Sequence, residues 1–68
     1  MIAKIKFPKT HILRAGSFYV GYCDARGNTP LTINRSEAME LDARDNAELK
    51  AKFFTSYFSA PVKPEVIA

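Results

Sequence analysis

Residues 17–33 of this chain, SFYVGYCDARGNTPLTI, predict a β-hairpin, and this hairpin decides the fold. Successive side chains of an extended strand point to opposite faces. In the first half of the segment this alternation puts Phe18, Val20 and Tyr22 on one face, and Tyr19, Gly21 and Cys23 on the other. We assign the first of these faces to the core, where it would be covered by a helix.

The turn of the hairpin is predicted at residues 24–27, Asp-Ala-Arg-Gly. Asp24 suits the first turn position because its carboxylate can accept a hydrogen bond from a nearby backbone amide. Gly27 can adopt the positive φ that closes a type I turn, and the combination is typical of a three-residue hairpin loop with a bulge. Pro30 predicts that the second strand is an edge strand or begins late, because proline cannot donate to a ladder.

Residues 1–7, MIAKIKF, alternate well enough to predict another strand, which Pro8 would end. This strand would turn Met1, Ala3, Ile5 and Phe7 toward the core and leave Ile2, Lys4 and Lys6 outside. Residues 11–14, HILR, predict either a further short strand or a loop with Ile12 or Leu13 beneath the sheet.

Two capping boxes, at residues 34–37 (NRSE) and 45–48 (DNAE), predict helix in the second half of the chain. At about 100° per residue, one continuous helix would put Leu41 almost opposite its apolar face. That face would consist of Leu49, Phe53, Phe54, Tyr57 and Phe58. We therefore favour two helices, at 35–43 and 46–59, over a single one.

Residues 61–68, PVKPEVIA, cannot continue a helix through their prolines and predict an extended tail after one small domain at 1–60. The apolar side chains of the tail have two possible places, on the chain's own sheet or on another chain. A frayed terminus is the third alternative.

Together these elements predict an α+β fold, in which a small antiparallel sheet of three to four strands forms a β-meander. One or two C-terminal α-helices follow and pack on one face of the sheet. The predicted core consists of Ile5, Phe7, Phe18, Val20, Tyr22, Leu31, Ile33, Leu49, Phe53, Tyr57 and Phe58.

The 68-residue chain has one cysteine, Cys23, and one histidine, His11. This excludes an intrachain disulfide and leaves too few ligands for structural zinc, so we expect no metal and no other cofactor. Cys23 and His11 are also the only soft nucleophile–base pair, with no evident group to orient the base, and we expect no enzymatic activity. No stretch matches a signal peptide or a membrane span, which predicts a cytoplasmic protein of a prokaryote or of a virus-infected cell.

The formal net charge is +3, and its distribution is uneven. Lys4, Lys6, Lys9 and Arg14 all precede the first acidic residue, Asp24. These cations indicate either a solvated strand face, which also discourages aggregation, or a polyanionic or acidic partner.

The first functional hypothesis is a non-enzymatic protein-binding protein. In size and character the chain is similar to small accessory proteins of phages and mobile elements, many of which act as inhibitors by occupying a surface on a host protein. Edge strands can add to a partner's sheet, and exposed tyrosine and arginine are frequent binding anchors. The candidate partner-binding residues are Lys4, Lys6, Lys9, Arg14, Tyr19 and Arg26.

Two alternatives remain open. A single-stranded nucleic-acid binder would track phosphates with the basic N-terminal strand and stack a base on Tyr19 or Tyr22. Exposure of Phe18 and Tyr22 would move this alternative ahead of the protein-binding hypothesis. An assembly or structural component would use residues 61–68 to tie subunits together, and a homodimer would bury surplus aromatic surface.

Overall fold

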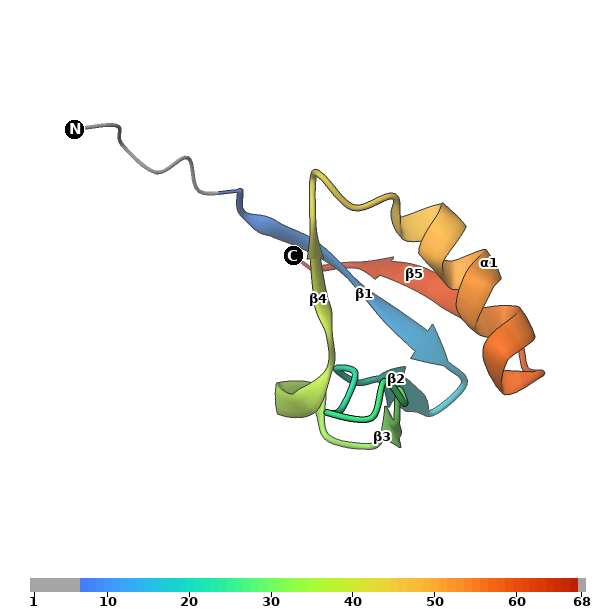
Figure 1. Ribbon diagram of the computed structural model, residues 1–68. Helices are drawn as coiled ribbons and strands as arrows, with labels where there is room; N and C mark the ends of the chain where they lie inside the picture. Colours follow the sequence, from blue (N-terminus) through green and yellow to red (C-terminus); the bar gives the residue numbers. More distant parts are fainter. Residues whose placement is uncertain (1–6, 68) are drawn as a thin grey trace.

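The computed structural model describes residues 7–67, which form a curled antiparallel sheet with one α-helix against it (Figure 1). In chain order the elements are β1 (Lys9–Ala15), β2 (Phe18–Val20), β3 (Leu31–Thr32), the 3₁₀ helix η1 (Arg35–Glu37), β4 (Glu40–Asp42), α1 (Ala47–Phe58) and β5 (Lys63–Val66). The predicted α+β class, with a small antiparallel sheet and a C-terminal helix, is confirmed.

Strand β1 is the element around which the sheet curls. Its C-terminal end pairs with β2, its N-terminal half with β4, and residues 11–14 with β5. The start of β4 also meets β2, because the Met39 N–H donates to the Val20 carbonyl at 2.8 Å. Other strands lie along both halves of β1, and α1 packs against the sheet. Ile12 and Leu13 of β1 are therefore almost fully buried.

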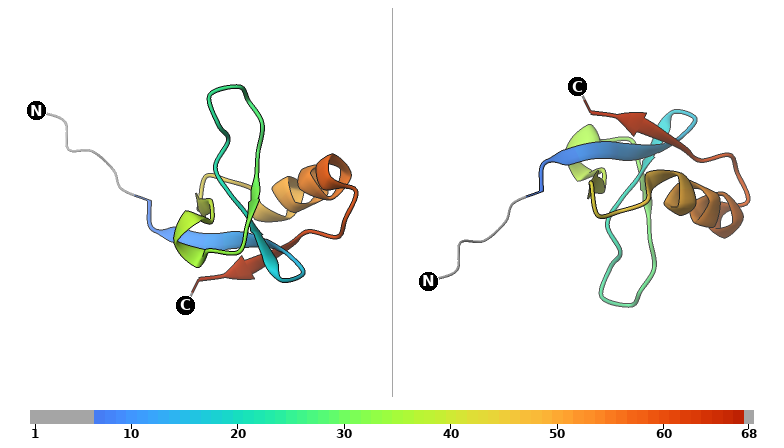
Figure 2. Two further views of the ribbon diagram at one scale, coloured as in Figure 1. Left: turned by 90° about the horizontal axis from the view of Figure 1, so that it is seen from below. Right: turned by 90° about the horizontal axis from the view of Figure 1, so that it is seen from above.

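The predicted hairpin and its turn are confirmed. Strands β2 and β3 pair antiparallel. The Gly27 N–H donates to the Asp24 carbonyl at 3.0 Å, and Gly27 has a φ of +84°. The Asp24 carboxylate accepts from the N–H groups of Arg26 at 2.8 Å and Asn28 at 3.0 Å. Figure 2 shows that the loop between the two strands projects from the sheet.

The predicted core face of this hairpin is wrong at two of its three positions. Val20 is fully buried, but Phe18 is 45% and Tyr22 55% exposed. Strand β2 ends at Val20, so Tyr22 already belongs to the projecting loop, and Phe18 lies beside the turn that leaves β1. Of the three residues only Val20 lies beneath other elements, and Gly21, from the opposite predicted face, is buried beside it.

The core also differs from the prediction elsewhere. The exposed residues that were predicted to be buried are Phe7, Leu31, Ile33, Leu49, Phe53 and Tyr57, while Phe58 is partly buried. The main buried cluster consists of Leu13, Ala15, Val20, Leu41, Ala51, Phe54 and Val62. The small side chain of Ala51 lets α1 approach the sheet closely, and this approach turns the Ala51–Phe54 side of the helix inward.

The strand predicted at 1–7 falls mostly outside the described residues, as do Ile5, Lys4 and Lys6. The described chain has its long strand at β1, so the alternative of a strand at 11–14 is correct and the loop is not. Phe7 is exposed, and the Arg44 guanidinium carbon lies 4.5 Å from its ring centroid.

The helix predicted at 35–43 is wrong, and so is the continuous helix. One 3₁₀ turn at η1 is followed by β4. Asn34 makes no side-chain cap to this turn. The Glu37 carboxylate instead accepts from the Thr32 hydroxyl at 2.8 Å and from the Asn34 side-chain amide at 3.1 Å. Leu41 is buried in β4, which pairs with β1, and this long-range pairing outweighs the local helix signal.

The helix predicted at 46–59 is confirmed as α1. The N-cap is Asn46, whose side-chain oxygen accepts from the Leu49 N–H at 3.0 Å. The predicted capping box began one residue earlier, at Asp45, and the Asp45 carboxylate instead accepts from the Asp42 N–H at 2.9 Å. The break predicted near residue 45 is also correct.

Residues after α1 return to the chain's own sheet, which was one of the placements left open. The Val62 side chain is buried, and its N–H donates to the Thr55 hydroxyl at 2.9 Å. Strand β5 then pairs with β1, and the Ile67 N–H continues the pairing by donating to the Thr10 carbonyl at 2.8 Å.

Candidate functional site

The predicted partner-binding residues that the structure describes are distributed over three places. Lys9 lies at the start of β1, Arg14 and Tyr19 lie across the β1–β2 pair, and Arg26 lies in the projecting loop. Arg14 and Tyr19 are brought together, with the Arg14 guanidinium carbon 5.0 Å from the Tyr19 ring centroid. Lys4 and Lys6 lie outside the described residues.

Two of these cations have carboxylate partners within the chain. The Lys9 ammonium lies 3.8 Å from the Asp42 carboxylate, and the Arg14 guanidinium 3.3 Å from that of Glu65. A phosphate backbone would have to compete with both carboxylates. Within residues 7–67, Arg14 has Glu65 to itself, whereas Lys9 shares Asp42 with Arg44, which lies closer at 2.7 Å. These pairings reduce the positive charge that the described part of the basic strand offers to phosphates, which weakens the electrostatic half of the nucleic-acid hypothesis.

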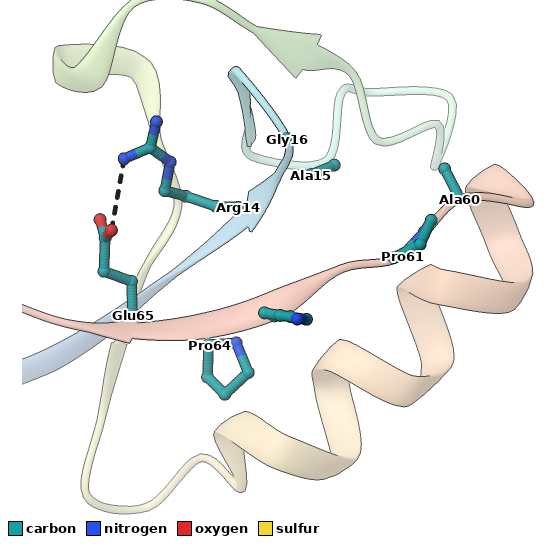
Figure 3. A pocket seen from close by; sticks show the side chains of 8 residues that line it. Arg14, Ala15, Gly16, Ala60, Pro61, Pro64 and Glu65 are labelled. Carbon is teal, nitrogen blue, oxygen red and sulfur yellow. Dashed lines mark hydrogen bonds and ion pairs between the residues drawn. The ribbon is translucent and has the colours of Figure 1, made fainter.

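An open hollow of about 690 Å³ lies beside the Arg14–Glu65 pair, between the end of β1 and the segment that leads from α1 into β5. Figure 3 shows Arg14 and Glu65 extending toward each other, with Pro61 and Pro64 along the same segment. Its charged lining residues are Arg14, Lys63 and Glu65, and it has no cysteine or histidine in its wall. The hollow thus offers apolar surface and charge but no nucleophile with a base.

Cys23 and His11 each make their hydrogen bond with a chain neighbour. The Cys23 thiol donates to the Asp24 carbonyl at 3.5 Å, and His11 Nδ1 lies 2.8 Å from the Thr10 hydroxyl oxygen. Within residues 7–67, no three His, Cys, Asp or Glu side chains gather as a metal site, and no helix is long and apolar enough to cross a bilayer.

The outer edge of β5 is a poor template for a partner strand. In an antiparallel pair, every second residue hydrogen-bonds to the partner strand. The hydrogen bond from the Ile67 N–H to the Thr10 carbonyl shows that residues 63, 65 and 67 are the ones that bond to β1, so the backbone groups of residues 64 and 66 point to the outer edge. Residue 64 is proline and has no N–H, which leaves Val66 as the only outward donor of the strand. Addition of a strand at this edge is therefore disfavoured.

Helix α1 carries a line of exposed apolar side chains. Leu49, Phe53 and Tyr57 are 63%, 62% and 46% exposed, and we call these three residues the helix stripe. They stand four residues apart, so at about 100° per residue their line lies about 130° around the helix from the inward-facing Ala51 and Phe54.

The stripe is held in place by contacts with its neighbours. The rings of Phe53 and Tyr57 are stacked, with centroids 6.1 Å apart and an interplanar angle of 24°. The buried Phe54 ring meets both edge-to-face, at 5.0 Å and 5.9 Å. The Tyr57 hydroxyl accepts from the Thr29 N–H at 3.3 Å, which ties one end of the stripe to the projecting loop.

Positive charge flanks the stripe on both sides. At about 100° per residue, Lys50 lies on the side of the stripe next to Tyr57, and Lys52 lies on the other side, beyond Ser56. Among residues 7–67, neither lysine forms an ion pair; the four pairs involve Lys9, Arg14, Arg35 and Arg44. Glu48 is the one acidic residue of α1.

Sequence reasoning missed the stripe because it assigned Leu49, Phe53 and Tyr57 to the core. It left Phe54, which is buried, out of the predicted core. The predicted apolar face, from Leu49 round to Phe58, covers about half of the helix circumference, which is more than one sheet can bury. The two alanines at 47 and 51 were the available sign of which side of the helix faces the sheet. They share a side with Phe54 and Phe58, and small residues allow the close approach that selects the inward face.

Comparison of the chain with protein-family models, with curated proteins and with solved structures gives no match. A functional assignment therefore depends on the chemistry of the chain's own surface.

Proposed function

We propose that this protein is a non-enzymatic protein-binding protein whose contact surface is the helix stripe of Leu49, Phe53 and Tyr57. The observation that carries the proposal is the exposure of these three neighbouring side chains on one helix. Burial of one large apolar side chain contributes about 1.5–3 kcal/mol, so covering the stripe is a substantial driving force for a small protein.

The stripe has the organisation of a binding anchor. Aromatic residues are enriched in the buried centres of interfaces, where a few of them provide most of the affinity. The Phe53–Tyr57 stack, the Phe54 ring behind it and the hydrogen bond from Thr29 hold the rings in position before any partner arrives. Such preorganisation lowers the entropy that is lost on association.

The proposal is tested by affinity capture from a lysate of the source organism with the tagged full chain. We expect one dominant protein, whose recovery is strongly reduced by Phe53→Ala and unchanged by Ile33→Ala. Ile33 is the matched control because it is an exposed apolar side chain outside the helix. Equal recovery by the two variants, or recovery of background proteins only, would contradict the proposal.

A single-stranded nucleic-acid binder is the second candidate, favoured by the exposure of Phe18 and Tyr22. Two such rings are a possible stacking surface. This candidate is weaker than the protein-binding proposal because Lys9 and Arg14, which would contact phosphates, lie beside the carboxylates of Asp42 and Glu65. It predicts retention of single-stranded RNA or DNA on filters at low salt, with affinity that falls steeply as salt rises and weakens in Phe18→Ala. No retention at low salt would exclude it.

A further inference from the structure

We propose that the segment bound by the helix stripe is an acidic amphipathic helix of a partner protein. This inference rests on the proposed function and specifies its partner. It is carried by the linear shape of the stripe and by the lysines along its two sides.

The shape of the stripe fits a helix. Leu49, Phe53 and Tyr57 follow one i, i+4, i+8 row and extend over about 12 Å at about 1.5 Å per residue. Such a row is a ridge, and ridges of one helix pack into the grooves of another. A partner helix with apolar residues at i, i+3, i+4 and i+7 presents a matching face over about two turns.

The positive charge beside the stripe specifies which residues should flank the apolar face of the partner helix. Lys50 and Lys52 lie on opposite sides of the stripe, and neither forms an ion pair among the described residues. The acidic residue of α1, Glu48, comes directly before Leu49 in the chain. Around the helix it lies on the same side of the stripe as Lys52 but farther from the stripe. Carboxylates on both sides of the partner's apolar face would meet these lysines, and complementary charge of this kind selects the partner and speeds encounter.

The same residues disfavour two other occupants. A second copy packed through its own stripe would bring two lysines and one glutamate from each α1, hence four lysines against two glutamates in one interface. A single-stranded nucleic acid would satisfy the lysines, but the Phe53 and Tyr57 rings are stacked with each other, with centroids 6.1 Å apart, and Leu49 offers no ring to a base.

The test is fluorescence polarisation with the full chain and a labelled peptide of about four helical turns. This peptide carries leucine at i, i+3, i+4 and i+7 with glutamate on both flanks, and a second peptide has lysine in place of each glutamate. We expect the acidic peptide to bind at least about tenfold more tightly at low salt. We expect the K50E/K52E variant to reverse this preference and Phe53→Ala to abolish binding of both peptides.

The matched control is R26E/K63E, which changes the net charge by the same amount at two exposed cations outside α1. The inference is overturned if this control also reverses the preference, or if the two peptides bind equally. It is also overturned if oligothymidylate displaces the acidic peptide, or if light scattering detects a dimer that Phe53→Ala dissociates. If neither peptide binds while Phe53→Ala still abolishes capture from the lysate, this inference fails and the proposed function stands. If capture is unaffected by Phe53→Ala, the proposed function itself fails.

Discussion

Asp42 is the buried charged side chain of the described chain, 4% exposed, and its surroundings are arranged to hold a negative charge. Arg44 donates to its carboxylate through the guanidinium, at 2.7 Å and 3.2 Å, and through the backbone N–H, at 2.9 Å. These hydrogen bonds lower the pKa of Asp42 to about 2, against the opposing effect of burial. Lys9 contributes a weaker attraction from 3.8 Å.

This arrangement predicts an acid-sensitive contribution to stability. The folded pKa lies below the ordinary value of 3.8, so the contribution is fully present above about pH 4 and is lost as the pH falls through about 2. We expect Asp42→Asn to lower the Tm at pH 7 and to reduce its fall between pH 4 and pH 2, measured by circular dichroism. Glu48→Gln, at an exposed carboxylate, should preserve that fall; an unchanged acid profile in Asp42→Asn would contradict the prediction.

Helix α1 illustrates at the scale of one element how neighbouring aromatic residues acquire different roles. Phe53 and Phe54 are adjacent in the sequence and both lie on the predicted apolar face of the helix, but only Phe53 was included in the predicted core. The turn of the helix points Phe54 at the sheet and leaves Phe53 in the stripe. Identical chemistry therefore contributes to stability at one position and is available for binding at the next.

Truncation should destabilise the protein much more at Phe54 than at Phe53. We expect Phe54→Ala to cost about 3–5 kcal/mol in the free energy of unfolding, because it opens a cavity in the core. Phe53→Ala should cost less than about 1 kcal/mol, since the ring loses only surface contacts. Urea unfolding followed by circular dichroism measures both. Similar losses in the two variants would mean that Phe53 is structural, and would remove it as a binding anchor.

At the scale of the whole molecule, the last strand completes the sheet that the first strand begins. Strand β5 lies against β1, and Val62 and Thr55 join the segment before β5 to α1. A small domain has a narrow stability margin, so loss of one strand out of this sheet is expected to be decisive.

Removal of the C-terminal segment tests this arrangement. A chain ending at Ser59 loses β5 and the buried Val62, and we expect it to lack a cooperative thermal transition and to be degraded rapidly by protease. Removal of Ile67 and Ala68 alone should leave the transition in place, because the β5–β1 pairing at 63–66 remains. A cooperative transition in the shorter chain would mean that β5 adds little to stability.

The features of the fold that the sequence alone determined are those that depend on residues close together in the chain. The turn at 24–27 depends on the Asp24 carboxylate and on the positive φ open to Gly27, and the start of α1 depends on the Asn46 cap. The turn and the start of the helix were predicted correctly, although the capping residue was expected at Asp45, one position too early. In both cases the donor, acceptor and backbone freedom involved lie within five residues of each other. The α+β class followed from the order of these local elements.

Only the tertiary structure decided which apolar side chains are buried and which remain as a surface. Leu41 belongs to a strand because β1 is available to pair with it, and residues 63–66 form β5 for the same reason. The helix stripe is exposed because the side of α1 that carries Ala51 and Phe54 packs against the sheet, and one sheet cannot cover both sides of a helix. These outcomes depend on partners tens of residues away, whose positions no local pattern of side chains specifies.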